Sequence, residues 1–306
     1  MSSQADQVAI VRSPTEERNT DTHDIDTLPT LDILRLINSE DHRVAPAVAA
    51  VLPQLAEAVD HTVHRLGAGG RVHYFGAGTS GRLAMMDAAE LPPTYGVEPH
   101  RVVAHHAGGQ DALVTAVEGI EDDDQQGAVD AADLASGDVA IGLSASGRTP
   151  YVAGALRVAR QAGATTVLIS ANPHADLADK ADIHVGMDTG AEVIAGSTRM
   201  KAGTAQKLAL NALSTAVMIR LGHTYSNLMV GMSANNAKLR GRMVTILADA
   251  SGQSAEDCAS ALAAANGETR TALVILLAGV DATDAATAVR AAGGSVRGAL
   301  RELGGT

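Results

Sequence analysis

The stretch YFGAGTSGRLAMMDAAELPPTYG, from Tyr74 to Gly96, joins a predicted strand to a predicted helix through a glycine-rich turn. Its glycines allow positive φ angles and close approach of the backbone. Hydroxyls and amides that open a helix after a strand can donate hydrogen bonds to an anion at the positive end of the helix. The stretch therefore predicts a cradle for a phosphate group. Its candidate contacts are Gly78, Thr79 and Ser80.

Short apolar runs alternate with helical patterns on both sides of this stretch, as far as residue 186. Such alternation is typical of an α/β protein with a parallel sheet covered on both faces, a three-layer αβα sandwich. Five strands fit a flavodoxin-like order, in which ligands bind at the carboxyl ends of strands. We expect the strands Arg71–Phe75, Arg101–His105, Asp138–Leu143, Thr165–Ser170 and Ile183–Gly186. The expected connecting helices are Gly81–Glu90, Asp111–Gly119, Thr149–Ala162 and a short piece near Pro173–Lys180.

The chain has 306 residues, enough for one large domain or two of ordinary size. Residues 1–28 are polar without a sustained period and predict a flexible N-terminal segment. Residues 29–242 are assigned to the sheet domain and its flanking helices, which include Ser197–Arg220 and Leu228–Leu247. Residues 243–306 predict a small C-terminal helical module, with one helix capped by Ser254 and others at Glu268–Val280 and Asp284–Ala292.

Composition limits the class of protein and its partners. Hydrophobic residues make up 46% of the chain and can bury a substantial core. The formal net charge of -12 disfavours nonspecific binding to nucleic acid or to an anionic membrane. The single cysteine, Cys258, excludes an internal disulfide and any multi-cysteine metal site. With no secretory leader pattern and no apolar run of about 18 residues, the sequence predicts a cytoplasmic protein without a membrane span.

A second hydroxyl-rich loop, SASGRTP from Ser144 to Pro150, also follows a predicted strand and opens a predicted helix. Either loop alone also fits a tight turn or a helix cap without a ligand. Two such loops at one sheet edge favour a phosphate monoester, with Ser144, Ser146 and Thr149 as further contacts. The pattern GxGxxG also fits a dinucleotide fingerprint, but no acidic ribose-binding residue follows the second strand, which disfavours a nucleotide.

Three glutamates near the loops are candidate acids or bases. Glu90 precedes Pro92-Pro93, which we expect to end the helix and to hold the carboxylate at the lip of the pocket. Glu118 and Glu121 lie in the acidic run AVEGIEDDD. Each of the three also fits an ordinary solvated glutamate, and composition does not choose between them.

Other polar residues leave two interpretations open. Glu192 and Lys201 fit either ligand contacts or a salt bridge at the start of the long helix. His105 and His106 are adjacent on a predicted strand and point to opposite faces, so we expect no metal site there. His223 fits a surface histidine or a ligand contact across a subunit boundary.

Longer strings carry a resemblance to a known family. The loops GAGTSGR and SASGRTPY resemble the sugar isomerase (SIS) domain. The strings DAAELPPTYG, AVEGIEDD, TGAEVIAGSTRMKAGTAQKLALN and NLMV resemble the N-acetylmuramic acid 6-phosphate etherase family over most of the chain. Members of that family cleave the D-lactyl ether of N-acetylmuramic acid 6-phosphate in peptidoglycan recycling. The products are N-acetylglucosamine 6-phosphate and D-lactate.

The resemblance implies a carbon–oxygen lyase that uses no cofactor. It implies removal of the proton on carbon 2 of the open-chain sugar, loss of lactate from carbon 3 and addition of water. Glu90 matches the family's proton donor and Glu121 its second catalytic glutamate, the expected carbon-2 base, although one carboxylate could serve both steps of a syn elimination. The resemblance also implies a homodimer and a UBA-like C-terminal module.

Two alternative functions are compatible with the same fold. A more distant resemblance to the glucokinase regulatory protein leaves open a regulator that binds sugar phosphates without turnover. An aldose–ketose isomerase would transfer a proton and release no acid. The presence of both Glu90 and Glu121 favours the etherase.

Overall fold

The computed structural model describes residues 13–115, 117, 119–232 and 237–304. These residues fall into two compact units. Unit 1 contains the described residues of Met1–Ala58, Val72–Met85 and Ala104–Asn211, and unit 2 those of Val59–Arg71, Met86–Val103 and Ala212–Thr306. The helices α3 (Leu52–Gly67), α4 (Gly78–Tyr95) and α8 (Lys201–Arg220) contribute residues to both units.

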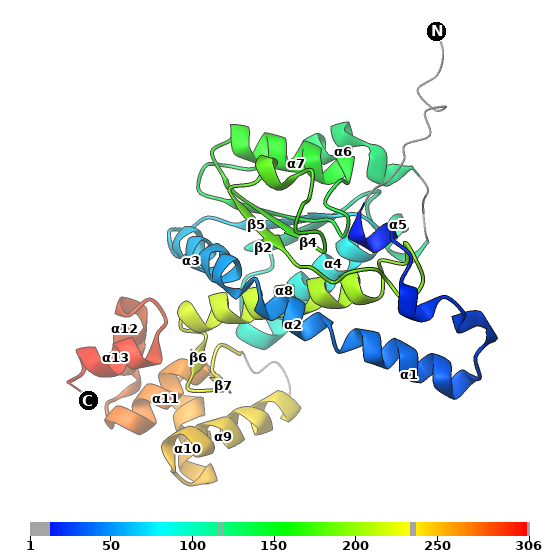
Figure 1. Cartoon of the computed structure of the whole chain (residues 1–306). Coiled ribbons are helices and arrows are strands. Elements are labelled where there is room, and N and C mark those ends of the chain that lie inside the picture. Colours follow the sequence, from blue (N-terminus) through cyan, green and yellow to red (C-terminus); the bar gives the residue numbers. More distant parts are fainter. Residues whose placement is uncertain (1–12, 116, 118, 233–236, 305–306) are drawn as a thin grey trace. The chain divides into compact units, whose positions relative to one another are not determined.

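The main sheet has five strands in the order β2-β1-β3-β4-β5 (Figure 1). Neighbouring strands from β1 to β5 run parallel, and the register places Gly76 opposite Leu143. The order is the flavodoxin-like one, and each strand agrees with its expected range to within one residue at either end, so both predictions are confirmed. The strands are β1 (Val72–Gly76), β2 (Val102–His106), β3 (Val139–Leu143), β4 (Thr165–Ser170) and β5 (Ile183–Gly186).

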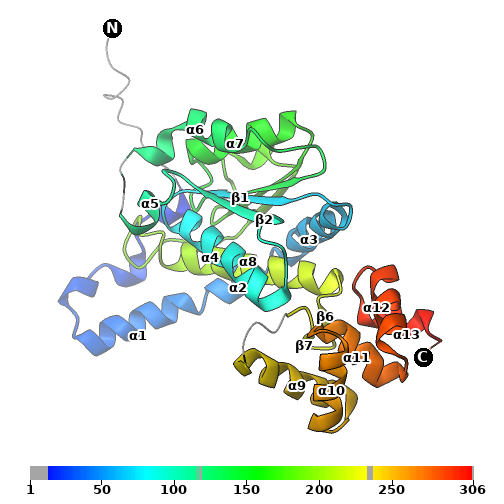
Figure 2. The same ribbon diagram turned by 180° about the vertical axis from the view of Figure 1, so that it is seen from behind.

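Helices cover both faces of the sheet in unit 1, as Figures 1 and 2 show from opposite sides. The helices α6 (Asp124–Asp130) and α7 (Pro150–Gln161) lie on one face, and the first turns of α4 and α8 lie on the other. β1, β3 and β4 are buried along their whole length, as expected for parallel strands covered on both sides. Phe75, Tyr151 and Leu156 belong to the core cluster between sheet and helix. The predicted three-layer sandwich is confirmed.

The N-terminal part of unit 1 differs from the expected loose segment. Residues 1–12 lie outside the described residues, and residues 13–28 form short 3-10 helices at Pro14–Glu16, Thr20–Thr22 and Ile25–Thr27. Thr22 donates a hydrogen bond to the carbonyl of Val193 at 2.9 Å, and the amide of Gly196 donates to the carbonyl of Thr15 at 3.0 Å. These partners lie far away in sequence, so local periodicity does not reveal them. The helices α1 (Thr30–Asp41) and α2 (Val44–Ala49) follow.

Two helices in this part of the chain differ from their expected ranges. α4 continues through Pro92 and Pro93 to Tyr95, so the expected stop before the prolines is wrong. The proline ring has a φ angle that suits a helix, but each proline removes one amide donor to the preceding turn and crowds the carbonyl four residues before it, which disfavours a helix without forbidding it. The amide of Gly96 still donates to the carbonyl of Pro92 at 3.0 Å. The helix α5 is limited to Asp111–Val114, and a 3-10 turn at Ile120–Asp122 and α6 follow it.

Unit 2 contains a hairpin and a helical cluster. The hairpin of β6 (Thr224–Tyr225) and β7 (Leu228–Met229) lies where a helix starting at Leu228 was expected. The five C-terminal helices are α9 (Ala237–Ser251), α10 (Ala255–Ala264), α11 (Thr269–Ala278), α12 (Ala282–Ala291) and α13 (Val296–Glu302).

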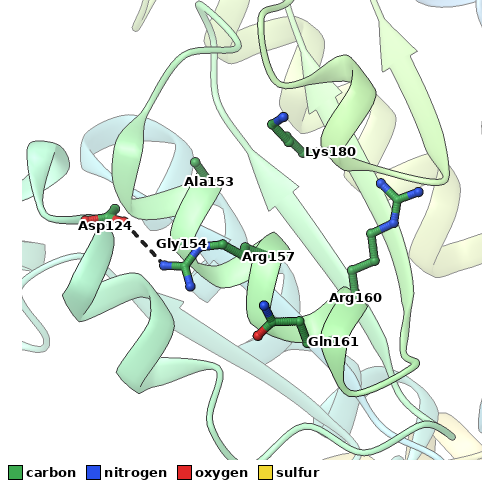
Figure 3. A pocket seen from close by; sticks show the side chains of 7 residues that line it. All are labelled: Asp124, Ala153, Gly154, Arg157, Arg160, Gln161 and Lys180. Carbon is green, nitrogen blue, oxygen red and sulfur yellow. Dashed lines mark hydrogen bonds and ion pairs between the residues drawn. The ribbon is translucent and has the colours of Figure 1, made fainter.

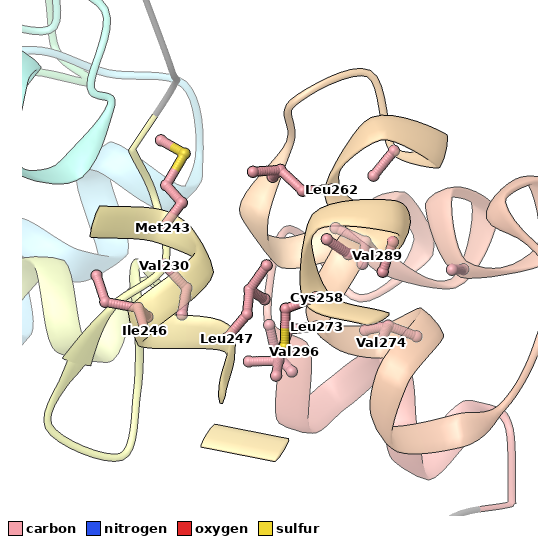
Figure 4. Close-up of a cluster of buried hydrophobic side chains, with 14 of the residues drawn as sticks. Val230, Met243, Ile246, Leu247, Cys258, Leu262, Leu273, Val274, Val289 and Val296 are labelled. Carbon is pink, nitrogen blue, oxygen red and sulfur yellow. The ribbon is translucent and has the colours of Figure 1, made fainter. Parts of the chain in front are cut away.

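The helical cluster of unit 2 has its own apolar core. Leu247, Cys258 and Leu273 lie at its centre, and Met243 belongs to the same cluster (Figure 4). Val230, beside the hairpin, belongs to the same core, and the expected boundary after residue 242 falls inside α9. Within the described chain, no single helix is long and apolar enough to cross a membrane, and α11 with α12 passes that test only as a pair bent by 113°.

Candidate functional site

The first loop is the tight connection between β1 and α4. β1 and β3 are parallel neighbours with Gly76 opposite Leu143, so this loop and the loop that begins at Ser144 start side by side at one edge of the sheet, as predicted. A Cβ atom on Gly81 would lie 2.5 Å from the carbonyl oxygen of Gly76 and 2.4 Å from Cδ2 of His106. Glycine is therefore required at position 81 for this close approach. Gly78 has a φ of +53°, which glycine adopts without strain.

A hollow of about 310 Å³ lies beside this loop in unit 1. Gly78 and Arg82 line it from the start of α4, His106 from the end of β2, and Glu121 from the 3-10 turn Ile120–Asp122. The carboxylate of Glu121 is exposed. The structure therefore brings one predicted catalytic residue to the same hollow as the glycine loop. Glu118, the alternative in the same run, lies outside the described residues.

Contacts fix the end of α5 and the residue next to Glu121. Arg82 donates from Nε to the carbonyl of Leu113 at 2.8 Å and from Nη2 to that of Ala112 at 2.9 Å. Ile120 packs against Gly108, where a Cβ atom would lie 2.2 Å from Cδ1 of Ile120. Arg82 was missed as a functional candidate, although it stands inside the GAGTSGR motif. Its charge and its place one turn into the helix were the available signal.

His106 was considered only as a metal ligand, and the structure gives it another role. Its Nδ1 lies 2.7 Å from the carbonyl of Ala107, and its Nε2 lies 3.2 Å from the carbonyl of Gly78. A neutral imidazole donates one N–H and so holds one carbonyl at a time, whereas an imidazolium holds both. His106 thereby ties the end of β2 to the glycine loop. Among the described residues, no group of three His, Cys, Asp or Glu side chains is arranged to hold a metal ion.

The two hydroxyls of the first loop have different surroundings. Thr79 is half-buried, whereas Ser80 is 7% exposed and donates from Oγ to Oε1 of Gln206 at 2.9 Å. Gln206 lies on α8 and is fully buried. No local pattern points to Gln206, because its contact with Ser80 joins residues 126 positions apart.

In the second loop, the Ser144 hydroxyl is turned inward. Ser144 is 1% exposed, and its Oγ accepts from the amides of Gly147, Arg148 and Thr149 at 3.0–3.4 Å. It also lies 2.8 Å from Oγ1 of Thr149. Because Oγ already accepts from amides, its own proton is directed to Thr149, and the proton of Thr149 is left for another acceptor. Ser144 therefore shapes the loop, while Ser146 and Thr149 are half-buried at its surface.

Glu90 belongs to unit 2 and is exposed. It lines a hollow of about 470 Å³ within that unit, together with Pro92, Met229, Leu239 and Arg242. Because α4 continues to Tyr95, Glu90 lies within the helix and not at its end, contrary to the expectation from the two prolines. The hollow is therefore lined by one acidic side chain, Glu90, one basic side chain, Arg242, and two methionines, Met229 and Met232.

Glu192 and Lys201 form a buried polar network. The Lys201 ammonium contacts Glu40 Oε2 at 2.5 Å, and both side chains are at most 4% exposed. Burial alone would raise the pKa of the Glu40 carboxyl, but Lys201, with help from Arg43 and Asn19, holds it below its ordinary value. Neither charged group of this pair faces solvent, so the structure gives Lys201 a structural partner in place of a ligand.

Glu192 caps the start of α8. Its carboxylate accepts from the amides of Lys201 and Ala202 at 3.0 and 2.9 Å, and the residue is fully buried. Burial raises the pKa of Glu192 above its ordinary value, although these two amides oppose the shift. The expected salt bridge of Glu192 with Arg199 or Lys201 is replaced by this backbone cap, and the Lys201 ammonium pairs with Glu40 instead.

His223 lies in unit 2, where its Nδ1 is 2.7 Å from the carbonyl of Tyr95. Burial lowers the pKa of His223, and the hydrogen bond to Tyr95 opposes this. The residue is half-buried within its own unit. The neutral ring therefore has a partner in the chain itself.

Another cavity, of about 450 Å³, lies on the outer side of α7 (Figure 3). Arg157, Arg160 and Lys180 line it, and Arg157 pairs with Asp124 at 3.3 Å. None of the predicted site residues lines this cavity. The predicted catalytic and phosphate-binding residues therefore lie elsewhere in the chain, and this cavity is not part of the candidate site.

Comparison with known proteins gives consistent matches over the chain. Residues 54–160 match the model of the glucokinase regulatory protein N-terminal SIS domain, and residues 114–216 match that of the SIS domain. A solved phosphoheptose isomerase from Francisella tularensis is 20% identical, with a TM-score of 0.48 over 63% of this chain and 100% of that one.

Curated relatives match almost end to end. An N-acetylmuramic acid 6-phosphate etherase of Thermobifida fusca is 71% identical over 98% of this chain and 98% of that protein. The etherases of Cutibacterium acnes and Klebsiella aerogenes are 51% and 50% identical over 87% and 86% of this chain and 88% and 89% of those proteins. The chain belongs to the N-acetylmuramic acid 6-phosphate etherase family and carries its SIS domain.

Proposed function

We propose that this chain cleaves the D-lactyl ether of N-acetylmuramic acid 6-phosphate and releases D-lactate and N-acetylglucosamine 6-phosphate. The observation that carries the proposal is the 71% identity to a curated etherase over 98% of both chains. The hollow beside the glycine loop, with Glu121 at its wall, supports the same chemistry.

The reaction needs one base and one acid. In the open-chain sugar, the proton on carbon 2 is acidic because it lies next to the aldehyde, and the ether oxygen on carbon 3 is in the β position. By their match to the family's catalytic pair, Glu121 is proposed to take that proton and Glu90 to protonate the ether oxygen as the carbon–oxygen bond breaks. Lactate leaves, and an unsaturated aldehyde remains. Water then adds its oxygen to carbon 3 and a proton returns to carbon 2, so the atoms balance without a redox step.

The test is release of lactate by the purified chain from N-acetylmuramic acid 6-phosphate. Each proton transfer contributes typically 10²–10⁴-fold, so Glu90→Gln and Glu121→Gln are each expected to lose a factor in this range in kcat. Asp122→Asn is the matched control, because Asp122 is the next acidic residue on the same turn. Turnover in deuterated water is expected to place deuterium on carbon 2 of the product. Absence of lactate, or of deuterium at carbon 2, contradicts the proposal.

The phosphate is proposed to bind at the carboxyl ends of β1 and β3, beside the hydroxyls of Thr79, Ser80, Ser146 and Thr149 and the amides at the start of α4. Hydrogen bonds to a charged group contribute about 1.5–3 kcal/mol each. Unphosphorylated N-acetylmuramic acid is therefore expected to have a KM higher by several orders of magnitude. An equal KM for both sugars would contradict the proposal that these loops bind the phosphate.

A second function is favoured by one observation. Residues 54–160 match the SIS domain model of the glucokinase regulatory protein, which suggests binding of a sugar phosphate without turnover. The two functions separate in one pair of measurements. Calorimetric binding of N-acetylglucosamine 6-phosphate with no lactate from the etherase substrate would support the regulator.

We further propose that the chain works as a cytoplasmic homodimer. Leu31 and Leu34 on α1 are each 57% exposed, and a second copy would bury such an apolar face. The molar mass from light scattering is expected to be twice the 31.1 kDa of one chain. The double substitution Leu31→Asp and Leu34→Asp is expected to reduce the molar mass to that of one chain. A wild-type monomer would contradict the dimer and leave the etherase assay unaffected.

A further inference from the structure

Gln206 has a buried side-chain amide, and only one of its two polar atoms contacts the glycine-rich loop between β1 and α4. It lies on α8 in unit 1, is 0% exposed, and accepts a hydrogen bond from Ser80 Oγ at 2.9 Å. Its other polar atom, Nε2, is buried and has no hydrogen-bond partner among the residues that the structure describes. Buried amide nitrogens rarely stay without an acceptor. The arrangement therefore has an unused donor directly behind the loop.

The hydrogen bond has a consequence for Ser80. A serine hydroxyl has a single proton and two acceptor lone pairs. While that proton is donated to Gln206, Ser80 can present only lone pairs to a ligand. A phosphate group accepts hydrogen bonds and repels lone pairs, so in this arrangement Ser80 cannot bind it.

A rotation of the amide frees the proton of Ser80 and gives the buried N–H of Gln206 an acceptor. Turning the Gln206 side-chain amide by half a turn exchanges Nε2 and Oε1 and keeps the heavy-atom positions almost unchanged. Nε2 then donates to Ser80 Oγ, and the proton of Ser80 becomes free to point at an anion. The unpaired atom becomes a carbonyl oxygen, which tolerates an unmade hydrogen bond better than an N–H.

We propose that Gln206 is a positioning residue that turns Ser80 into a hydrogen-bond donor for the phosphate of the substrate. This inference rests on the proposed function, because it concerns the phosphate-binding step of the same site. The second loop follows the same rule, since Ser144 Oγ accepts from amides and directs its own proton to Thr149. In both loops a buried neighbour fixes which hydroxyl proton is available to the ligand.

The test is a double-mutant cycle on Ser80 and Gln206. Binding of N-acetylglucosamine 6-phosphate is measured by calorimetry, and KM and kcat are measured with the etherase substrate. Gln206→Glu keeps the size of the side chain but offers only acceptors, and Gln206→Met removes both polar atoms. Gln161→Met on α7 is the matched control, because Gln161 is exposed and distant from the loop in sequence. Thermal unfolding checks that each variant is folded.

Gln206→Glu is expected to weaken sugar-phosphate binding roughly 10–100-fold, the effect of one hydrogen bond to a charged group, because its carboxylate keeps the proton of Ser80. Gln206→Met leaves that proton free and is expected to weaken binding less than Gln206→Glu does. The loss is expected in KM, with kcat changed less than 3-fold, and to shrink below about 2-fold in a Ser80→Ala background. Equal losses in both backgrounds, or wild-type binding by Gln206→Glu, overturn the inference. Calorimetry needs no turnover, so a chain that binds the ligand but releases no lactate contradicts the proposed function alone.

Discussion

Replacing Lys201 by methionine is expected to lower the free energy of unfolding by about 3 kcal/mol. Removing one partner of a buried ion pair typically costs about 3–5 kcal/mol, because the other charge is left buried. The Glu40 carboxylate keeps two partners, Asn19 at 2.9 Å and Arg43 at 3.4 Å, which places the loss at the lower end of that range. A loss of this size is a large part of the roughly 5–15 kcal/mol that stabilises a typical protein.

The assay is urea unfolding followed by circular dichroism, with activity measured in parallel. Arg157→Met is the matched control in the same unit, since its pair with Asp124 is 46% and 49% exposed and is worth about 1 kcal/mol or less. Glu40→Gln combined with Lys201→Met removes both charges and is expected to recover part of the loss. The reasoning is refuted if Lys201→Met unfolds at the wild-type urea concentration but has a raised KM, because the ammonium would then contact the substrate.

The same pair predicts a pH dependence. The pKa of Glu40 is lowered in the folded chain, so the unfolded chain takes up the proton first as the pH falls. The stability from this carboxylate is complete well above the ordinary glutamate pKa of about 4.3 and is lost as the pH falls below it. Unfolding at pH 7 and at pH 4 is expected to differ more in the wild type than in the doubly substituted chain. An equal difference would contradict the assigned direction of the shift.

Three further predictions test separate parts of the chain. Gly81→Ala would place a Cβ atom 2.5 Å from the carbonyl of Gly76, so it is expected to lower the melting temperature and to abolish binding of sugar phosphate; normal binding would show that the turn relaxes. Arg82→Gln removes the guanidinium that holds the carbonyl of Leu113, so kcat is expected to fall about 10-fold with less change in KM, and an unchanged kcat would show that Glu121 is positioned otherwise. Ser254→Ala removes the cap of α10 and is expected to cost about 1 kcal/mol in unfolding free energy, whereas Ser260→Ala, at an exposed position within the same helix, is the control and is expected to cost less.

The fold was predictable because its signals are local. The strands of the sheet are short, buried and separated by helical patterns, so each one is visible in the sequence without knowledge of its neighbours. The long α7 agrees with its expected range to within a residue at either end, because Thr149 and Pro150 mark its start. The error at Pro92 arose because a proline disfavours an interior helical position without always ending the helix.

The site was less predictable because its important contacts join distant residues. The loop hydroxyls were found from the motif, but the hydrogen bonds that use them up, Ser80 to Gln206 and Ser144 within its own loop, depend on packing. The role of Lys201 depends on Glu40, which lies 161 positions away. A sequence pattern shows which residues can donate, and it does not show which donors are already engaged.

The inward-facing Ser144 has a consequence for affinity. Three backbone amides that could otherwise remain unpaired in an empty site already have an acceptor within the loop. Such a loop supplies its own stand-in for an anion, so its amides hold the loop together before a ligand binds. Binding then requires little ordering of the backbone, so less of the interaction energy is lost to conformational entropy.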